Sequence, residues 1–397
     1  MNGNIQRFKI LSAGVFSLIL TMGVARFAYT PLLPIMQQQA GLGVAEGGWL
    51  AAVNYLGYLC GALVATMISD LSVKDRLYRI GLVVAVITTA GMGLTENIWL
   101  WSLFRFLAGL SCAAGMLLGG GLILNWLIRN GYRSELGITF GGVGLGMVLC
   151  SIAVELMSGY FDWSQQWLLF TVIALVIMLP AWVWLPPPDS TKVTSSGETM
   201  IDSPPGPVFM RVFLVAYFCA GIGYVVSATF IVAIVDQLPG LEGKGVWAFM
   251  AMGVGATVSA IIWDLIARRI GLLNALISAS ILQILGILLP VIEPNLIFTM
   301  TGAILFGATF SGMVCLVLTM AGRYYPTRPA KMMGKMTLSF GVAQIIGPLI
   351  AGLLAEESGN YNDGLYMAAI VMAFGSVLLV TLKSLEPKIK QVQLAHP

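Results

Sequence analysis

The sequence predicts an all-α membrane protein with twelve transmembrane helices, and three observations carry this prediction. Hydrophobic residues make up 58% of the 397 positions and charged residues only 10%. The mean hydropathy is +0.89, whereas a soluble domain carries about 25% charged residues. The hydrophobic stretches are continuous over about 20 residues, the length of a helical crossing, and a β-barrel would need alternating ten-residue segments instead.

Twelve hydrophobic stretches follow one another along the chain, separated by short polar or charged segments. Because a crossing and its loop take about 33 residues, the length of the chain has room for about twelve of them. The first stretch is too long for the apolar region of a removable signal peptide. We expect helices at residues 10–37, 46–69, 78–95, 98–128, 135–158, 164–185, 209–236, 245–266, 271–291, 296–321, 335–355 and 364–383.

The loops between these helices alternate in charge, and this alternation predicts their sides. Of the 21 Lys and Arg residues, only Lys244 falls in a predicted external loop, and only Arg26 and Arg105 fall inside predicted spans away from their cytoplasmic ends. All others lie at the termini or in alternate loops. Because Lys and Arg are retained on the cytoplasmic side, both termini are predicted to be cytoplasmic. The external segments carry the acids Glu46, Glu96, Asp162, Glu242, Glu293, Glu356, Glu357 and Asp363.

A polar segment rich in Pro, Ser and Thr divides the chain into two halves of six spans each. It begins at Pro186-Pro187-Pro188 and ends at Pro204-Pro205-Gly206-Pro207, without a helical period. Such composition is typical of a linker. We therefore predict a first six-helix bundle at residues 1–187, a cytoplasmic linker at 188–207 and a second six-helix bundle at 208–397.

The two halves resemble each other. Asp70 ends the second predicted span and is followed by Lys74, while Asp264 ends the eighth and is followed by Arg268. The two acids are 194 positions apart, about half the chain. Repeated six-span halves are typical of transporters that rock two bundles around a central site.

These features resemble the major facilitator superfamily, and the resemblance covers the whole chain. Asp70 and Lys74, echoed by Asp264 and Arg268, match part of its loop motif between spans two and three. Arg105 and Gly109 are similar to its Arg-x-x-x-Gly motif, which implies a role of Arg105 in proton coupling. The loop clusters are implied to act as a latch that holds the outward-facing state. Span two, from Trp49 to Tyr58, together with the stretch from Arg26 to Pro34, is similar to a poorly characterised bacterial branch of the superfamily.

Three charged residues lie at membrane depth in the predicted amino-terminal bundle: Arg26, Arg105 and Glu155. An arginine at a helix centre costs about 2.5–3.5 kcal/mol on insertion scales, so such charges are retained for pairing or function. One interpretation is a structural network in which Arg105 extends outward to water. The other is a solute site in which an arginine binds an anionic group on two points and Glu155 exchanges a proton. For this site we predict that Arg26 contacts the solute and that Glu155 is its partner in the empty protein.

Polar and aromatic side chains supply the rest of a predicted substrate site. Asn54 and Tyr58 lie in the second span, Tyr217 and Tyr224 share one face of the seventh, and Gln344 lies in the eleventh. Aromatic residues in helices also serve as plain packing. With Arg26, the predicted substrate contacts are Asn54, Tyr58, Tyr224 and Gln344.

These observations predict a proton-coupled secondary active transporter of a small organic anion or zwitterion, with export as the favoured direction. Alternatives are an uptake symporter for an organic anion or amino acid, and a lipid flippase or transporter-like sensor. We expect a monomer in a bacterial inner membrane whose partners are the solute, protons and lipid.

Other classes of protein lack their sequence signatures here. The phosphate-binding loop of an ATP-driven pump and the motifs of hydrolases are missing. The only histidine is His396, so we expect no histidine-bound metal, no cofactor and no catalytic residue, hence no enzyme. With a net charge of only +3 and no basic stripe, no nucleic-acid partner is expected.

Overall fold

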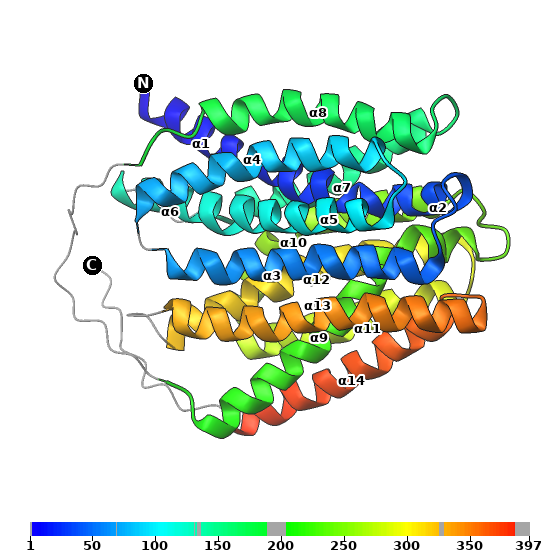
Figure 1. The fold of residues 1–397 in the computed structure, drawn as a ribbon. Helices are drawn as coiled ribbons and strands as arrows, with labels where there is room; N and C mark the ends of the chain where they lie inside the picture. Colours follow the sequence, from blue (N-terminus) through cyan, green and yellow to red (C-terminus); the bar gives the residue numbers. More distant parts are fainter. Residues whose placement is uncertain are drawn as a thin grey trace.

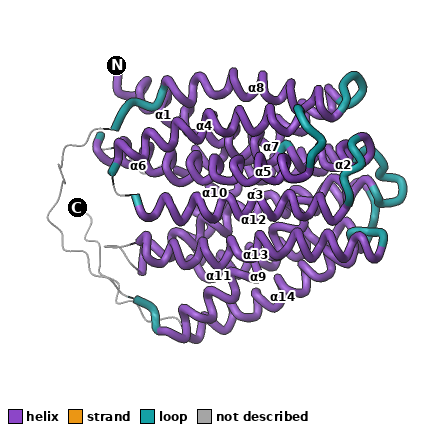
Figure 2. The backbone as a smooth tube through the Cα atoms, viewed as in Figure 1, coloured by secondary structure: helices purple, strands orange, loops and turns teal. Residues whose placement is uncertain are grey.

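The computed structural model describes residues 2–68, 70–130, 132, 136–188, 204–324 and 329–385, and in this part of the chain all regular structure is helical (Figures 1 and 2). The helices are α1 (Asn2–Leu18), the π-helix η1 (Ile19–Phe27), α2 (Tyr29–Gln39), α3 (Val44–Met67), α4 (Leu71–Gly93), α5 (Ile98–Ala113), the π-helix η2 (Ala114–Gly119), α6 (Gly120–Arg129), α7 (Leu136–Met157), α8 (Trp163–Val183), α9 (Pro207–Asp236), α10 (Gly245–Ile270), α11 (Leu272–Ile292), α12 (Leu296–Tyr324), α13 (Pro329–Ser358) and α14 (Asn362–Leu385).

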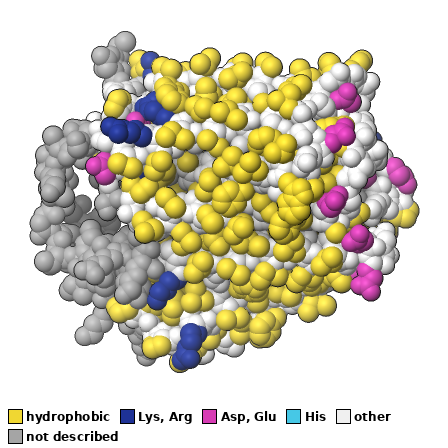
Figure 3. Space-filling model, in the orientation of Figure 1, with side chains coloured by type: hydrophobic (Ala, Val, Ile, Leu, Met, Phe, Trp, Pro, Cys, Tyr) yellow, Lys and Arg dark blue, Asp and Glu magenta, His cyan; other side chains and the backbone are white. Residues whose placement is uncertain are grey.

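The prediction of twelve membrane spans is confirmed. The first span combines α1, η1 and α2, and the fourth combines α5, η2 and most of α6. The start of α1, the end of α8, the start of α9 and the end of α14 lie at the same end of the molecule (Figure 1). On the face drawn in Figure 3, hydrophobic side chains fill the middle, Lys and Arg gather at that end, and most Asp and Glu lie at the other. The cytoplasmic location of that end stays a prediction.

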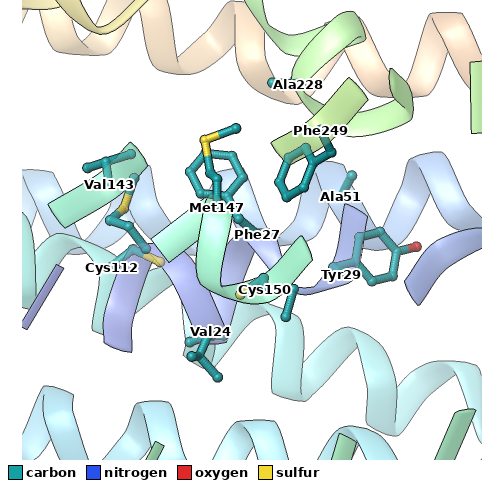
Figure 4. Packing of buried hydrophobic residues seen from close by; sticks show 14 of the residues in the cluster. Val24, Phe27, Tyr29, Ala51, Cys112, Val143, Met147, Cys150, Ala228 and Phe249 are labelled. Carbon is teal, nitrogen blue, oxygen red and sulfur yellow. The ribbon is translucent and has the colours of Figure 1, made fainter. Parts of the chain in front are cut away.

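The spans form two six-helix bundles that meet along two seams. Helix α3 packs along α13, and α7 packs along α10. Between the seams, Phe27 of η1 lies against Phe249 of α10 with ring centroids 6.3 Å apart. Figure 4 shows these two rings within the layer of buried side chains that joins the bundles. Large buried apolar side chains therefore hold the two halves together. The exact boundaries of the bundles and the linker stay a prediction.

Glycines at repeated positions let helices cross closely in both bundles. The Cα of Gly57 in α3 faces the carbonyl of Phe106 in α5, and that of Gly255 in α10 faces the carbonyl of Ile304 in α12. Any Cβ at these positions would collide with backbone. Both members of the second crossing lie 198 positions after those of the first, four more than the offset between Asp70 and Asp264, so the two halves also repeat each other in three dimensions. A second matched set is Gly109 against Asn54 and Gly307 against Met252.

Candidate functional site

A cavity of about 340 Å³ lies between the two bundles. It runs from mid-membrane residues, such as Arg26 and Tyr224, to the helix ends around Thr66 and Lys74. It therefore opens toward the end of the molecule that carries the start of α1. The lining residues are Met22, Arg26, Tyr58, Leu59, Ala62, Leu63, Ala65, Thr66, Ile68, Lys74, Met116, Leu117, Leu118, Phe140, Val143, Tyr217, Tyr224, Phe310, Ser311, Val314, Leu318, Met333, Gly334, Thr337, Leu338, Phe340 and Gln344.

Contacts between the bundles close the opposite side of the cavity. The hydroxyl of Thr30 in α2 donates to the carbonyl of Ala228 in α9 at 3.1 Å. Nearer the loops, Gln37 Nε2 donates to the Tyr361 hydroxyl at 3.5 Å. Burial raises the pKa of the Tyr361 phenol above its ordinary value, which keeps this hydroxyl neutral. The site is thus accessible from one side only, as an alternating-access carrier requires.

Arg26 is the charged group at the closed end of the cavity, and its side chain is only 4% exposed. Its guanidinium stacks over the Tyr55 ring at 4.3 Å and lies 5.4 Å from the centre of the Tyr58 ring. Nη1 donates to the sulfur of Met22 at 3.9 Å, a weak acceptor, and Nε has no acceptor. In the described part of the chain no Asp or Glu forms a salt bridge with it. Buried guanidinium groups normally have a carboxylate or several carbonyl partners. The guanidinium of Arg26 therefore still has N–H groups with which to bind an anion.

Arg105 differs from Arg26 because its N–H groups donate hydrogen bonds to backbone carbonyls. The side chain is 3% exposed and does not line the cavity. Its Nη1 donates to the carbonyls of Ala25 and Arg26 at 3.2 and 3.4 Å, and Nε donates to that of Leu50 at 3.4 Å. The expectation that Arg105 extends outward to water is therefore wrong. Its helix turns the side chain toward η1 rather than toward the surface.

Two of these carbonyls, those of Ala25 and Arg26, lie in the π-helix η1. Wide π-turns interrupt the regular bonding ladder and occur often at functional sites. Pro31 follows shortly after and offers no N–H to the turn before it. The hydrogen bonds from Arg105 fix the segment that presents Arg26. Proton coupling through Arg105 stays a prediction, while its contacts are those of a positioning residue.

Replacing Arg105 by lysine should destabilise the protein more than it weakens solute binding. A lysine cannot span the three carbonyls that the guanidinium reaches, and buried carbonyls lose partners worth about 1.5–3 kcal/mol each. We expect the midpoint of thermal unfolding in detergent to fall by roughly 5 °C or more. An unchanged midpoint with lost solute affinity would instead make Arg105 a direct contact.

Tyr58, Tyr224 and Gln344 line the cavity with Arg26, whereas Asn54 does not. Asn54 is fully buried and donates from Nδ2 to the carbonyl of Arg105 at 2.8 Å. Its position against α5 at the close glycine crossing keeps it out of the cavity lining, and a role of Asn54 in substrate binding stays a prediction. Of the predicted substrate contacts, the structure brings Arg26, Tyr58, Tyr224 and Gln344 together.

Arg26 and Tyr224 occupy matching positions of the repeat, because they are 198 residues apart, as Gly57 and Gly255 are. The first faces the cavity from η1 and the second from α9. The repeat thus places a cation on one bundle opposite a phenol on the other. A comparison of the two halves at this offset could have found the pair from sequence.

Glu155 is not the partner of Arg26, so the expected pairing is wrong. Glu155 is exposed on α7 and lines a separate small pocket with Trp247 of α10. Its electrostatic neighbour is Asp236, at the end of α9. The physical reason is rotation about the helix axis: Glu155 has the expected depth but points away from the cavity. Its part in proton exchange stays a prediction.

The predicted latch residues make contacts within their own helices or loops. Asp70 Oδ1 accepts hydrogen bonds from the backbone N–H groups of Ser72 and Val73 at 2.7 and 3.1 Å, and so caps α4. Asp264 pairs with Arg268 one turn later on α10, at 2.5 Å and with both side chains exposed. The latch role of Asp70, Lys74, Asp264 and Arg268 stays a prediction.

The charges on the cavity wall are all positive. Arg26 at the closed end and Lys74 near the mouth are the charged residues among the described lining, and no Asp or Glu is among them. The same part of the chain holds no group of three His, Cys, Asp or Glu side chains that could bind a metal ion. The field inside the cavity favours anions over cations.

Sequence reasoning missed Phe310 and Phe340, which line the cavity beside Tyr217 and Tyr224. Phe340 stacks on Tyr217 with centroids 4.6 Å apart, and Phe310 lies 5.0 Å from Tyr224. The signal that could have found Phe340 is its spacing: it precedes Gln344 by one helical turn and shares its face.

Comparison with known families gives a match over most of the chain. The profile of the family described as "Uncharacterised MFS-type transporter YbfB" matches residues 18–380. The chain is 22% identical to the "Uncharacterized MFS-type transporter YceJ" of Bacillus subtilis, covering 92% of this chain and 95% of that protein.

Two further relatives have names that state a solute. The chain is 19% identical to a "Gentisate transporter" of Corynebacterium glutamicum, covering 91% of this chain and 85% of that protein. It is 22% identical to the "Probable sulfoacetate transporter SauU" of Cupriavidus necator, covering 92% of each.

Among solved structures, the fold is similar to that of the nucleoside transporter NupG. The TM-score is 0.69 at 16% sequence identity, and the match covers 97% of this chain and 99% of that one. At this identity the likeness concerns the fold.

Proposed function

We propose, from the premise that this chain belongs to the major facilitator superfamily of transporters, that it carries a small organic anion across the membrane by alternating access. As a member of this superfamily it is a multi-pass membrane transporter and not an enzyme. The proposal adds the class of solute and the mode of binding, which the family alone leaves open.

The observation that carries the proposal is that the buried guanidinium of Arg26 has no carboxylate partner among the described residues. Holding a buried cation without a carboxylate costs several kcal/mol, which an anionic solute would offset on binding. The described lining has a second cation, Lys74, and no acid, so a cationic solute would meet only repulsion. Two relatives, named for gentisate and for sulfoacetate, have names that denote organic anions, which supports this class.

Counterflow in proteoliposomes tests the proposal. Vesicles loaded with unlabelled gentisate or sulfoacetate should accumulate the same labelled anion when they contain the protein, and vesicles with Arg26→Met should not. Labelled uridine serves as the neutral solute and should remain at the level of empty vesicles. Counterflow of uridine with neither anion moved would contradict an anion carrier.

We also propose that the proton gradient drives transport and that the direction is export. The cavity opens at the end that is predicted to be cytoplasmic. A conformation open to the cytoplasm is the one in which an exporter binds its solute. Because the described cavity lining has no carboxylate, a coupling proton would bind elsewhere. Glu155 remains the candidate, since it lies at the interface of the bundles, beside Trp247 of α10.

Replacing Glu155 by glutamine should abolish accumulation driven by a proton gradient and leave exchange of labelled for unlabelled anion intact. The variant keeps the shape of the side chain but cannot bind and release a proton. Glu293→Gln, an exposed acid after α11, is the matched control and should accumulate normally. Normal accumulation by Glu155→Gln would remove it as the coupling residue. The measurement is uptake into everted vesicles at imposed pH differences.

A further inference from the structure

The second bundle presents a continuous row of aromatic rings to the cavity. Tyr217 and Tyr224 come from α9, Phe310 from α12 and Phe340 from α13. Phe340 lies between the two tyrosines, 4.6 Å from Tyr217 and 5.7 Å from Tyr224, with interplanar angles of 25° and 26°. Phe310 continues the row at 5.0 Å from Tyr224. Such a wall offers flat π surface to a bound molecule, and stacked aromatic pairs gain about 0.5–1.5 kcal/mol beyond plain burial.

The cation for the anionic end comes from the other bundle. Arg26 on η1 and Tyr224 on α9 both line the cavity, so the guanidinium and the aromatic row face the same space from opposite bundles. A molecule bound to both must have its negative group and its flat body close together. A carboxylate attached directly to a ring has this shape, and about 340 Å³ accommodates a single substituted ring.

Gln344 adds a requirement for a hydrogen-bond donor. It lies one turn after Phe340 on α13, lines the cavity and is only 4% exposed. Its Oε1 is buried and accepts no hydrogen bond. A buried carbonyl oxygen without a donor costs about 1–3 kcal/mol, which a donor on the ligand would recover.

We propose that the solute is a single-ring aromatic carboxylate with a hydroxyl or amino group on the ring. The carboxylate binds Arg26, the ring stacks on the row of Tyr217, Tyr224, Phe310 and Phe340, and the ring substituent donates to Gln344 Oε1. This inference rests on the proposed anion transport and narrows its substrate. It assigns a role to two cavity-lining residues that each carry a buried polar atom without a hydrogen-bond partner, Arg26 Nε and Gln344 Oε1.

The test measures equilibrium binding of four probes to the purified full-length protein in detergent. The probes are 3-hydroxybenzoate, 4-hydroxybenzoate, benzoate and cyclohexanecarboxylate, which share the carboxylate but differ in the ring and the donor. We expect one hydroxybenzoate to bind about tenfold tighter than benzoate, and benzoate to bind several-fold tighter than cyclohexanecarboxylate.

Two variants separate the contributions of donor and ring. In Gln344→Leu, the ratio of hydroxybenzoate to benzoate affinity should fall to about one. This change removes an unsatisfied oxygen from an apolar setting, so the variant should fold. In Phe310→Leu, the preference for benzoate over cyclohexanecarboxylate should shrink while the hydroxyl preference persists.

Equal affinities of benzoate and cyclohexanecarboxylate, or a hydroxyl preference that survives in Gln344→Leu, would overturn the inference. Binding of sulfoacetate but of none of the four probes, abolished by Arg26→Met, would also overturn it and leave anion transport standing. If no anion binds in a manner that depends on Arg26, the inference and the proposed function fail together.

Discussion

Replacing Arg26 by methionine should abolish anion binding and yet leave the empty protein at least as stable as before. The guanidinium would give an anion two charge-assisted hydrogen bonds, each worth about 1.5–3 kcal/mol, so affinity should fall at least about a hundredfold. In the empty protein the same group is buried, its Nη1 donates to the weak acceptor Met22 Sδ, its Nε has no acceptor, and it has no carboxylate partner in the described part of the chain. Removing it relieves a desolvation cost that the rings of Tyr55 and Tyr58 offset by only about 0.5–2 kcal/mol.

The measurement is paired: solute affinity and the midpoint of thermal unfolding without solute, for the wild type and Arg26→Met. A structural arginine would behave in the opposite way, with a lower midpoint and unchanged affinity, and that outcome would reject Arg26 as the solute contact. Arg26→Lys is the intermediate variant, because it keeps the charge but loses the planar two-point geometry. We expect it to bind about tenfold more weakly than the wild type.

The sequence predicted how deep in the membrane the charged residues lie, but not the direction in which their side chains point. Hydropathy locates where a helix crosses, so the twelve spans and the depth of Arg26 were within reach. Rotation about the helix axis depends on packing. On α7, the buried positions Met147, Cys150 and Val154 form one stripe, and Glu155 lies on another with exposed Ile152. Depth alone therefore suggested Glu155 as the partner of Arg26, although α7 directs the Glu155 side chain away from it.

The direction of the Arg105 side chain could not be predicted from depth either. Its nearness to the external border of the membrane suggested that the side chain reaches water. The close crossing of α5 and α3 at Gly57 instead turns the side chain inward, where carbonyls of η1 accept its hydrogen bonds. Those carbonyls lie in a π-helix, for which the sequence carries only a partial signal in Pro31. Contacts between distant segments, not local preference, decide the role of this residue.

Replacing Gly48 by alanine should shift the protein toward a conformation open at the opposite side. Gly48 lies near the start of α3, where an added Cβ would be 2.5 Å from the carbonyl oxygen of Pro348 in α13. This contact joins the two bundles at the side that is closed here. It must be lost when that side opens, so the methyl group penalises only the present state. Overpacking costs about 1–3 kcal/mol, which changes the ratio of the two states by about tenfold or more.

Gly57→Ala on the same helix is the matched control, since its Cβ would collide with Phe106 of α5 within one bundle. That contact persists when the bundles rock as rigid bodies, so the control should lower the unfolding midpoint without changing the balance of states. Spin labels at the exposed positions Glu46 of α3 and Glu356 of α13 report the separation of the two helices. The partly exposed Cys60 and Cys315 are replaced by serine to avoid extra labelling. The label distance should lengthen in Gly48→Ala and stay at the wild-type value in Gly57→Ala. The same lengthening in both variants would mean that loosened packing, not a selective clash between the bundles, governs which side is open.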